Sequence, residues 1–195
     1  MSQKRRRSFE DGKGSSSHRP MMDLTLVNFE VTNEPKIVHS EAVYDILDQA
    51  APLLKMQNGQ EAERLFRRAL ELEPEQPDLL HNLAAALALQ DRHTEALVIV
   101  NRMFQEHPDY LFARTALAMH AMQAGDLQKA ADLLEPLFER RKFHFSEFDA
   151  LCATQIELLL RQGNLLSART WFEMWENSNP KNTKLEQFRT LFPER

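Results

Sequence analysis

Apolar residues recur at intervals of three and four along most of the chain from Val43 onward. This spacing is typical of helices that each bury one face. The inner faces of four such helices read Ile46, Ala50 and Leu53; Leu80, Leu83, Ala84 and Leu87; Leu117, Ala118 and Ala121; and Cys152, Ile156 and Leu159. A second helical segment follows each of the four after a short turn. The pattern therefore predicts an all-α chain built from helix pairs.

The predicted helix pairs recur at a nearly fixed period. Four alanines, Ala62, Ala96, Ala130 and Ala168, are separated by 34, 34 and 38 residues. A bulky apolar residue follows four positions after each alanine, and in three of the four cases a proline stands eight positions further on. Periods of this length indicate a stack of similar units. The spacing predicts four units, over residues 43–76, 77–110, 111–144 and 149–182.

The period with its alanine, apolar residue and proline resembles the tetratricopeptide repeat (TPR) family, most closely over Gly59–Pro74. The resemblance implies a helix–turn–helix solenoid, in which the first helices line a concave groove and the second helices form the convex back. It also implies a non-catalytic module for protein–protein interaction.

Residues outside the repeats show other patterns. Residues 1–20 are rich in serine and carry six basic residues against two acidic ones, which predicts a disordered basic tail. Residues 21–42 are predicted to be an extended leader. Residues 183–195 place Leu185, Phe188, Leu191 and Phe192 at helical spacing, so they are predicted to form a capping helix on the last unit.

The leader contains alternating apolar positions over residues 23–31, typical of a strand. An otherwise helical chain offers this strand no partner. We therefore expect it either to lie against the helices, with Phe29 covering the free end of the first unit, or to remain loose.

Three local features depart from the regular repeat. Pro52 and Pro136 fall inside predicted helices, where the ring removes a hydrogen bond, so two bends are predicted. Arg114 occupies a position that is apolar in the other first helices, so a local departure from regular packing is predicted in the third unit. Four extra residues follow the third unit, so residues 140–148 are predicted to form a bent or longer connection.

Composition narrows the class of protein further. The chain has only five glycines in 195 residues, which favours helices over tight strand turns. Gly59, Gly125 and Gly163 are each predicted to end the first helix of a pair, because such ends often need a positive φ. A single cysteine, Cys152, excludes an intramolecular disulfide and is predicted to be a core residue. The apolar runs are too short for a membrane helix and no secretion signal is evident, so we expect a cytoplasmic protein.

Catalytic chemistry finds little support in the sequence. The seven histidines show no ligand spacing for a metal. Acidic residues such as Glu61 and Glu63 alternate with arginines at helix spacing, which indicates a solvated face. The chain has no glycine-rich phosphate loop and no nucleophile elbow. We therefore predict a protein that is not an enzyme and that needs no cofactor or metal.

The predicted binding surface is the groove formed by the first helices. Its candidate residues are Tyr44, Leu47, His81, Asn82, Phe112, Met119 and Met122. The set is mostly apolar and includes adaptable methionines, which favours an apolar or amphipathic peptide. The family's carboxylate-binding clamp is not matched, since Leu47, Phe112 and Ala116 stand where basic or amide residues are needed. A second reading is that these residues are covered by the leader or only support packing.

The partner's identity is not encoded in these patterns. A more specific hypothesis from the resemblance is a small TPR chaperone for a secreted or assembly subunit. A different hypothesis is a nucleic-acid-associated regulator that uses its basic tail, although the acidic remainder of the chain opposes docking on a duplex. Formation of a homo-oligomer stays open.

Overall fold

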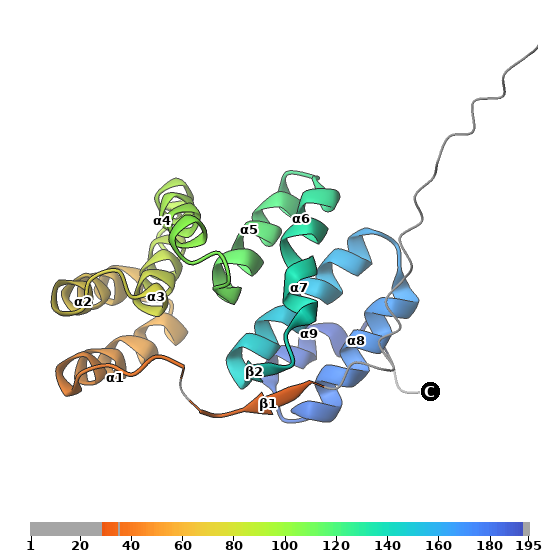
Figure 1. Cartoon of the computed structure of the whole chain (residues 1–195), viewed down its shortest axis with the longest axis horizontal. Helices are drawn as coiled ribbons and strands as arrows, with labels where there is room; N and C mark the ends of the chain where they lie inside the picture. Colours follow the sequence, from red (N-terminus) through yellow and green to blue (C-terminus); the bar gives the residue numbers. More distant parts are fainter. Residues whose placement is uncertain (1–28, 35, 193–195) are drawn as a thin grey trace, which may run out of the picture.

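The computed structural model describes residues 29–34 and 36–192, so the predicted tail and most of the strand over residues 23–31 lie outside the described residues. Four antiparallel helix pairs follow one another along the chain (Figure 1). They are α1 (Glu41–Lys55) with α2 (Gly59–Leu72), α3 (Pro77–Ala88) with α4 (His93–Glu106), α5 (Leu111–Gln123) with α6 (Leu127–Leu134), and α7 (Phe145–Arg161) with α8 (Leu165–Ser178). The predicted all-α array of helix pairs is confirmed. The division of the chain into four units at the boundaries given above stays a prediction.

The turns inside the pairs are set by local backbone chemistry. Gly125 and Gly163 have φ values of 82° and 73°, as predicted for residues that follow a helix end. The reason predicted for Gly59 is wrong, because the positive φ of that turn belongs to Gln57 (59°). Gly59 is instead the first residue of α2, where a Cβ atom would lie 2.6 Å from the carbonyl oxygen of Ala86. This glycine therefore allows α2 to pack closely on α3.

The buried apolar residues form two clusters. The N-terminal cluster is made by α1 to α4 and includes Phe66 and Met103. The C-terminal cluster is made by α5 to α8 and the segments around them, and it includes Trp171 and Trp175. Helix α5 contributes to both clusters through different residues. The structure therefore has two halves that meet at α5.

The predicted leader strand has a partner after all. Strand β1 (Glu30–Thr32) pairs in parallel with β2 (Lys142–His144), in a register that places Val31 opposite Phe143. The expectation that no partner exists is wrong, because the extra residues after α6 leave the helical path and offer a backbone edge. The Phe29 ring lies 5.4 Å from that of Phe143 and 6.2 Å from that of Trp171. The expectation that Phe29 covers the first unit is therefore also wrong, since it packs beside α8.

A second anchor fixes the leader beside α1. The ring of His39 is almost fully buried, with Nδ1 2.6 Å from Glu73 Oε2 and Nε2 2.7 Å from Asp78 Oδ2. The backbone N–H of Ser40 donates to Glu73 as well. Between the two anchors, Lys36 lies 2.6 Å from the buried carboxylate of Glu147 on α7. The leader thus contacts both halves of the molecule.

The two prolines have different effects. At Pro136 the predicted bend is confirmed, because α6 ends at Leu134 and the chain continues as the 3-10 helix η2 (Glu135–Glu139). Helix α1 instead runs through Pro52 to Lys55, so this proline does not end the helix.

Arg114 is accommodated by polar contacts in place of apolar packing. Its guanidinium donates to the carbonyl oxygens of Pro108 (2.6 Å) and Leu133 (3.2 Å) and lies 5.3 Å from the ring centre of Phe104. Arg114 therefore ties α5 to the segments on either side of it.

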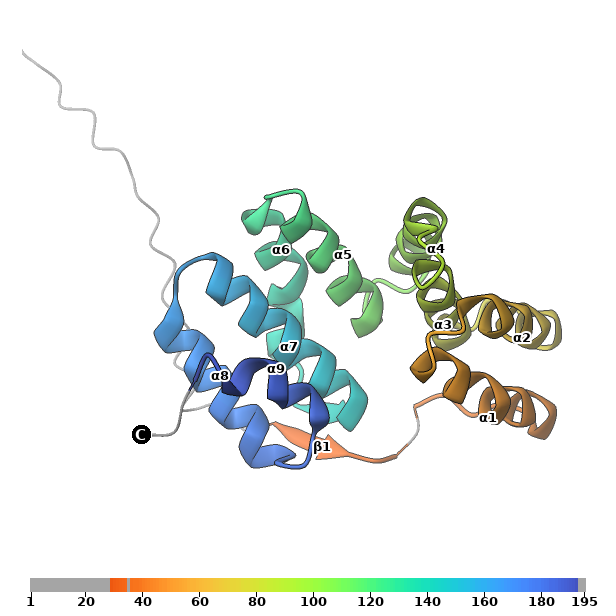
Figure 2. The same ribbon diagram turned by 180° about the vertical axis from the view of Figure 1, so that it is seen from behind.

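The C-terminal segment covers the last helix pair, as predicted. It contains the 3-10 helix η3 (Thr183–Leu185) and α9 (Glu186–Arg189), which lie beside α7 and α8 in Figure 2. The ring of Phe188 lies 6.0 Å from Trp175, and that of Phe192 lies 5.3 Å from Phe172. In the described part of the chain, no helix is both long and apolar enough to cross a membrane.

Candidate peptide-binding cleft

A cleft of about 360 Å³ lies where α5 meets α3 and α4, which we call the α3–α5 cleft. Most of its lining is apolar, and small side chains predominate. The lining residues are His81, Ala84, Ala85, Ala88, His93, Ala96, Leu97, Val100, Ala116, Met119, His120 and Gln123. Alanine side chains on α3, α4 and α5 leave space that larger side chains would fill. The short side chains therefore create the α3–α5 cleft.

His81 and Phe112 form an aromatic pair beside this cleft. Their rings stack with centres 4.6 Å apart, and the ring of Tyr110 lies 5.6 Å from Phe112. Burial removes water from His81 and lowers its pKa to about 4, although Asp78 opposes this shift. His81 is therefore neutral at pH 7. A neutral imidazole offers one hydrogen-bond donor and one acceptor without the larger cost of desolvating a charge.

The structure gathers only part of the predicted set at the cleft. His81 and Met119 both line it, with Met119 37% exposed, and Phe112 stacks on His81. Asn82 and Leu47 are half-buried on α3 and α1 and are not part of its lining.

Two predicted residues have other surroundings. Tyr44 is 40% exposed, and its hydroxyl accepts a hydrogen bond from the backbone N–H of His39. Met122 is 1% exposed and belongs to the C-terminal cluster, so it presents no surface to a peptide.

Several lining residues were not predicted from the sequence. Ala84 and Ala96 occupy positions typical of the core, so no local signal marks the space in front of them. His93, His120 and Gln123 lie on helix ends or turns, outside the apolar stripes that guided the prediction. A helical-wheel comparison of α4 with α5 is the signal that could have found them.

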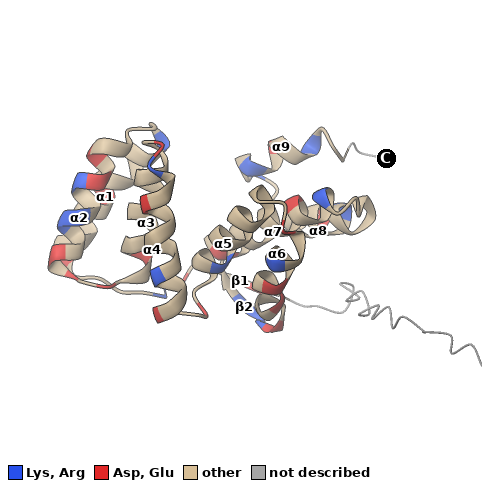
Figure 3. Ribbon diagram, turned by 90° about the horizontal axis from the view of Figure 1, so that it is seen from above, with Lys and Arg blue, Asp and Glu red and all other residues tan. Residues whose placement is uncertain are grey.

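The structure gives the surroundings of the possible metal ligands, of the cysteine and of the acidic residues on α2. Within residues 29–34 and 36–192, no group of three His, Cys, Asp or Glu side chains could hold a metal ion. Cys152 is fully buried, and burial raises the pKa of its thiol well above the usual value. Glu61 and Glu63 pair with Arg64 and Arg67 at distances of 2.5 and 2.8 Å along α2, and Figure 3 shows the interspersed charges. The expected pairing with arginines is present, but the expectation of a solvated face holds for Glu61, whose side chain is 44% exposed, and not for Glu63, whose side chain is 12% exposed.

Comparison with known proteins decides the family. The family model described as tetratricopeptide repeat matches residues 53–110 and 88–154, which together span more than half of the chain. The chain belongs to the tetratricopeptide repeat family. The TPR fold supports a protein–protein interaction module, and TPR proteins are in general non-catalytic.

Solved TPR structures resemble this one at low sequence identity. A TPR protein of Parabacteroides merdae is 18% identical, with a TM-score of 0.48 over 76% of this chain and 57% of that one. The TPR-like repeats of a putative kinesin light chain from Podosopora anserina are 19% identical, with a TM-score of 0.49 over 75% and 79% of the two chains. A thermophilic TPR protein of Thermus thermophilus is 19% identical, with a TM-score of 0.44 over 76% and 97%.

The chain thus spans little more than half the length of the Parabacteroides protein. A search of the curated proteins finds no significant match to this sequence.

Proposed function

We propose that this TPR protein is a non-catalytic interaction module that binds an apolar or amphipathic segment of a partner protein on its first-helix face. We take the α3–α5 cleft as the anchor of this site, and we keep Tyr44, Leu47 and Asn82 as candidate contacts on the same first helices. The observation that carries the proposal is the cleft itself, an apolar opening of about 360 Å³ between three helices.

The chemistry of the cleft favours a peptide with apolar anchors. A helix that binds in a groove presents apolar side chains at intervals of three or four residues, and these fill openings between helices of the receptor. Met119 at the edge adapts its shape to different guests because its side chain is flexible and polarizable. His81 supports such a guest, since its neutral ring adds a polar contact without a buried charge.

The partner itself is defined only by this chemistry. We also propose that the protein is located in a reducing compartment such as the cytoplasm, where Cys152 stays a thiol. Neither a chaperone role nor a nucleic-acid role is favoured by a particular contact among the described residues.

The test is capture and affinity with a matched pair of variants. Partners of the tagged full chain are recovered from its native host and identified by mass spectrometry, and their affinity is then measured with purified proteins. The variant Ala85→Asp with Met119→Asp places two carboxylates in the cleft, so we expect the affinity to fall about tenfold or more. Val98→Asp serves as the control because Val98 lies on α4 outside the cleft and is 65% exposed.

The two variants give opposite predictions. Binding should survive Val98→Asp and be lost in the cleft variant, while both proteins keep their helical circular dichroism. If the folded cleft variant still binds its partner with unchanged affinity, the proposed site is wrong.

A further inference from the structure

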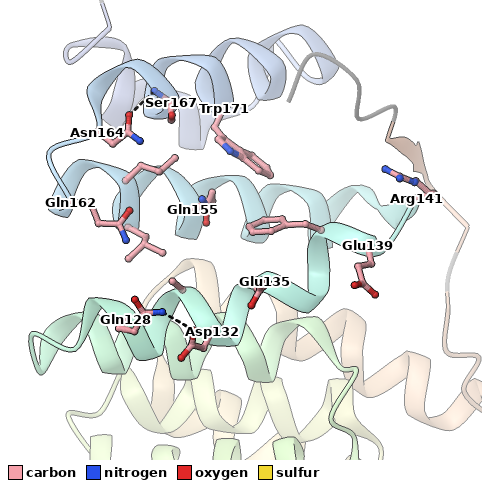
Figure 4. A pocket seen from close by; sticks show the side chains of 14 residues that line it. Gln128, Asp132, Glu135, Glu139, Arg141, Gln155, Gln162, Asn164, Ser167 and Trp171 are labelled. Atoms are coloured by element: carbon pink, nitrogen blue, oxygen red, sulfur yellow. Dashed lines mark hydrogen bonds between the residues drawn. The ribbon is translucent and has the colours of Figure 1, made fainter. Parts of the chain in front are cut away.

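A second cleft, of about 480 Å³, lies between the second helices of the last two pairs, which we call the α6–α8 cleft. Figure 4 shows its walls. One wall is formed by α6 and η2, the floor by α7, and the other wall by α8. The cleft shares no lining residue with the α3–α5 cleft.

The cleft opens because α6 is short. The second helices α2, α4 and α8 each have 14 residues, whereas α6 has 8 and gives way to η2 at Pro136. Consecutive units of a solenoid bury their faces against one another. Here α6 ends at Leu134, η2 continues the wall, and α8 forms the opposite wall of the cleft.

The floor of the cleft faces away from the predicted groove. Gln155, Leu159 and Gln162 are spaced by four and three residues, so they share one face of α7. Ala153 and Glu157 lie on the opposite face of α7 by the same spacing, and the walls of the cleft are the second helices α6 and α8, which belong to the convex back. A ligand in the α6–α8 cleft would therefore bind the back of the array.

The interior of the cleft combines apolar surface with one unsatisfied acceptor. Phe138 of the lining is half-buried, whereas Leu158 and Trp171 behind it are each 2% exposed. Gln155 points into the space from the middle of the floor (Figure 4). Its Oε1 atom is buried and has no hydrogen-bond partner among the described residues. Because a buried acceptor without a partner costs free energy, a ligand that donates a hydrogen bond there gains affinity.

The wall formed by α6 and η2 is acidic. Asp132, Glu135 and Glu139 are spaced by three and four residues along it, and all three are exposed. Gln128 donates a hydrogen bond to Asp132 at 2.8 Å, and Arg141 is the one Lys or Arg side chain in the described lining. The lining thus carries an excess of negative charge, which selects for a basic ligand through charge complementarity.

We infer that the α6–α8 cleft binds a basic amphipathic segment of a partner protein. Apolar side chains of the segment pack on the half-buried Ala131 and Phe138, its Lys or Arg side chains face the acidic wall, and an N–H group donates to Gln155 Oε1. This site is independent of the function proposed for the α3–α5 cleft.

The first test measures charge selection with defined probes. The probes are a fluorescent helical peptide of leucine and lysine and a matched peptide of leucine and glutamate. We expect the full chain to bind the lysine peptide about tenfold or more tightly than the glutamate peptide, and Asp132→Lys with Glu139→Lys to abolish that difference. Val98→Asp, which lies outside both clefts, should leave the difference between the two peptides unchanged, and the difference should persist in Ala85→Asp with Met119→Asp. Equal binding of both probes, or loss only in the Ala85 and Met119 variant, overturns the inference.

The second test isolates the unsatisfied acceptor. Gln155→Met keeps the approximate size of the side chain and removes Oε1, so thermal stability should hold or rise while lysine-peptide affinity falls about fivefold. Unchanged affinity in this variant contradicts the assigned hydrogen bond.

A last control asks whether the chain's own basic run fills the cleft. In this control, Lys4–Arg7 are replaced by serine in the full chain. If the affinity for the lysine peptide then rises about tenfold, the chain's own basic run occupies the cleft and the inference of a partner protein is wrong.

Discussion

In the two halves of the molecule, neighbouring helix pairs are joined by different kinds of packing. In the N-terminal half, α1 to α4 pack on one another in sequence, and Gly59 lets α2 approach the backbone of α3. In the C-terminal half the helical path is broken after α6, and the gap is filled by β1, β2 and rings that include Phe29, Phe143 and Trp171.

The difference shows what a few extra residues do to a repeat array. Where the period is kept, as from α1 to α4, consecutive helices pack directly on one another. Where the period lengthens, a strand from outside the repeats is recruited, and part of the gap stays open as the α6–α8 cleft. The longer junction therefore adds an acidic cleft on the second-helix side to the α3–α5 cleft of the regular units.

The largest expected effect comes from core substitutions, which should lower the stability of one half of the molecule without the other. Phe66→Ala in α2 and Phe172→Ala in α8 each remove a buried ring, which costs about 3–5 kcal/mol. Both tryptophans, Trp171 and Trp175, lie in α8, so their fluorescence reports on the C-terminal half alone. Because units of an array contact mainly their neighbours, we expect Phe66→Ala to leave the fluorescence midpoint of denaturant unfolding nearly unchanged. Phe172→Ala should lower that midpoint.

Circular dichroism provides the control for this comparison, since it follows helices in both halves. For Phe66→Ala, circular dichroism should show an unfolding transition at low denaturant concentration that tryptophan fluorescence does not show. If both variants shift both signals together, the halves unfold as one unit and the comparison fails.

A smaller effect concerns the leader anchor at His39 and its dependence on pH. Burial lowers the pKa of His39, but the hydrogen bonds to Glu73 and Asp78 outweigh it and raise the pKa above 6.5. The stabilisation is therefore fully present below pH 6.5 and is lost as pH rises through the raised pKa. Hydrogen bonds from Ser40 and His39 lower the pKa of Glu73 from 4.5 to about 2, so its contribution is present above pH 4.5 and lost toward pH 2.

The two shifts together predict greatest stabilisation by this anchor between about pH 4.5 and 6.5. His39→Gln should therefore lower the unfolding midpoint more at about pH 5.5 than at about pH 9. His93→Gln is the control, because the His93 side chain is 72% exposed. An effect of His39→Gln that is the same at both pH values would contradict the role of the imidazolium.

The regular part of the fold could be predicted because it follows from local rules. The alanine period and the apolar stripes are sufficient to predict the helix pairs, and Gly125 and Gly163 mark two of the turns through their backbone conformation. Gly59 shows the limit of the local rule, since its role comes from the approach of a helix that lies 27 residues away at Ala86.

The leader and the clefts could not be predicted for a related reason. Phe29 and Phe143 are far apart in the sequence, and nothing in either segment indicates the other. A cleft is space that side-chain packing leaves unfilled. Its presence depends on the positions of α5 and α8 relative to the neighbouring helices. Met122 illustrates this for the candidate site, because its helical position alone did not reveal that the C-terminal cluster covers it.

The central claim is that the α3–α5 cleft holds the partner segment, and site-specific photo-crosslinking tests it most directly. A photoreactive phenylalanine analogue is placed at Met119, at Val98, or at Gln128 on the edge of the α6–α8 cleft, in the full chain with its purified partner. The account predicts a covalent adduct from position 119 and none from position 98. Adduct formation at position 98 or 128 without any at position 119 would contradict it.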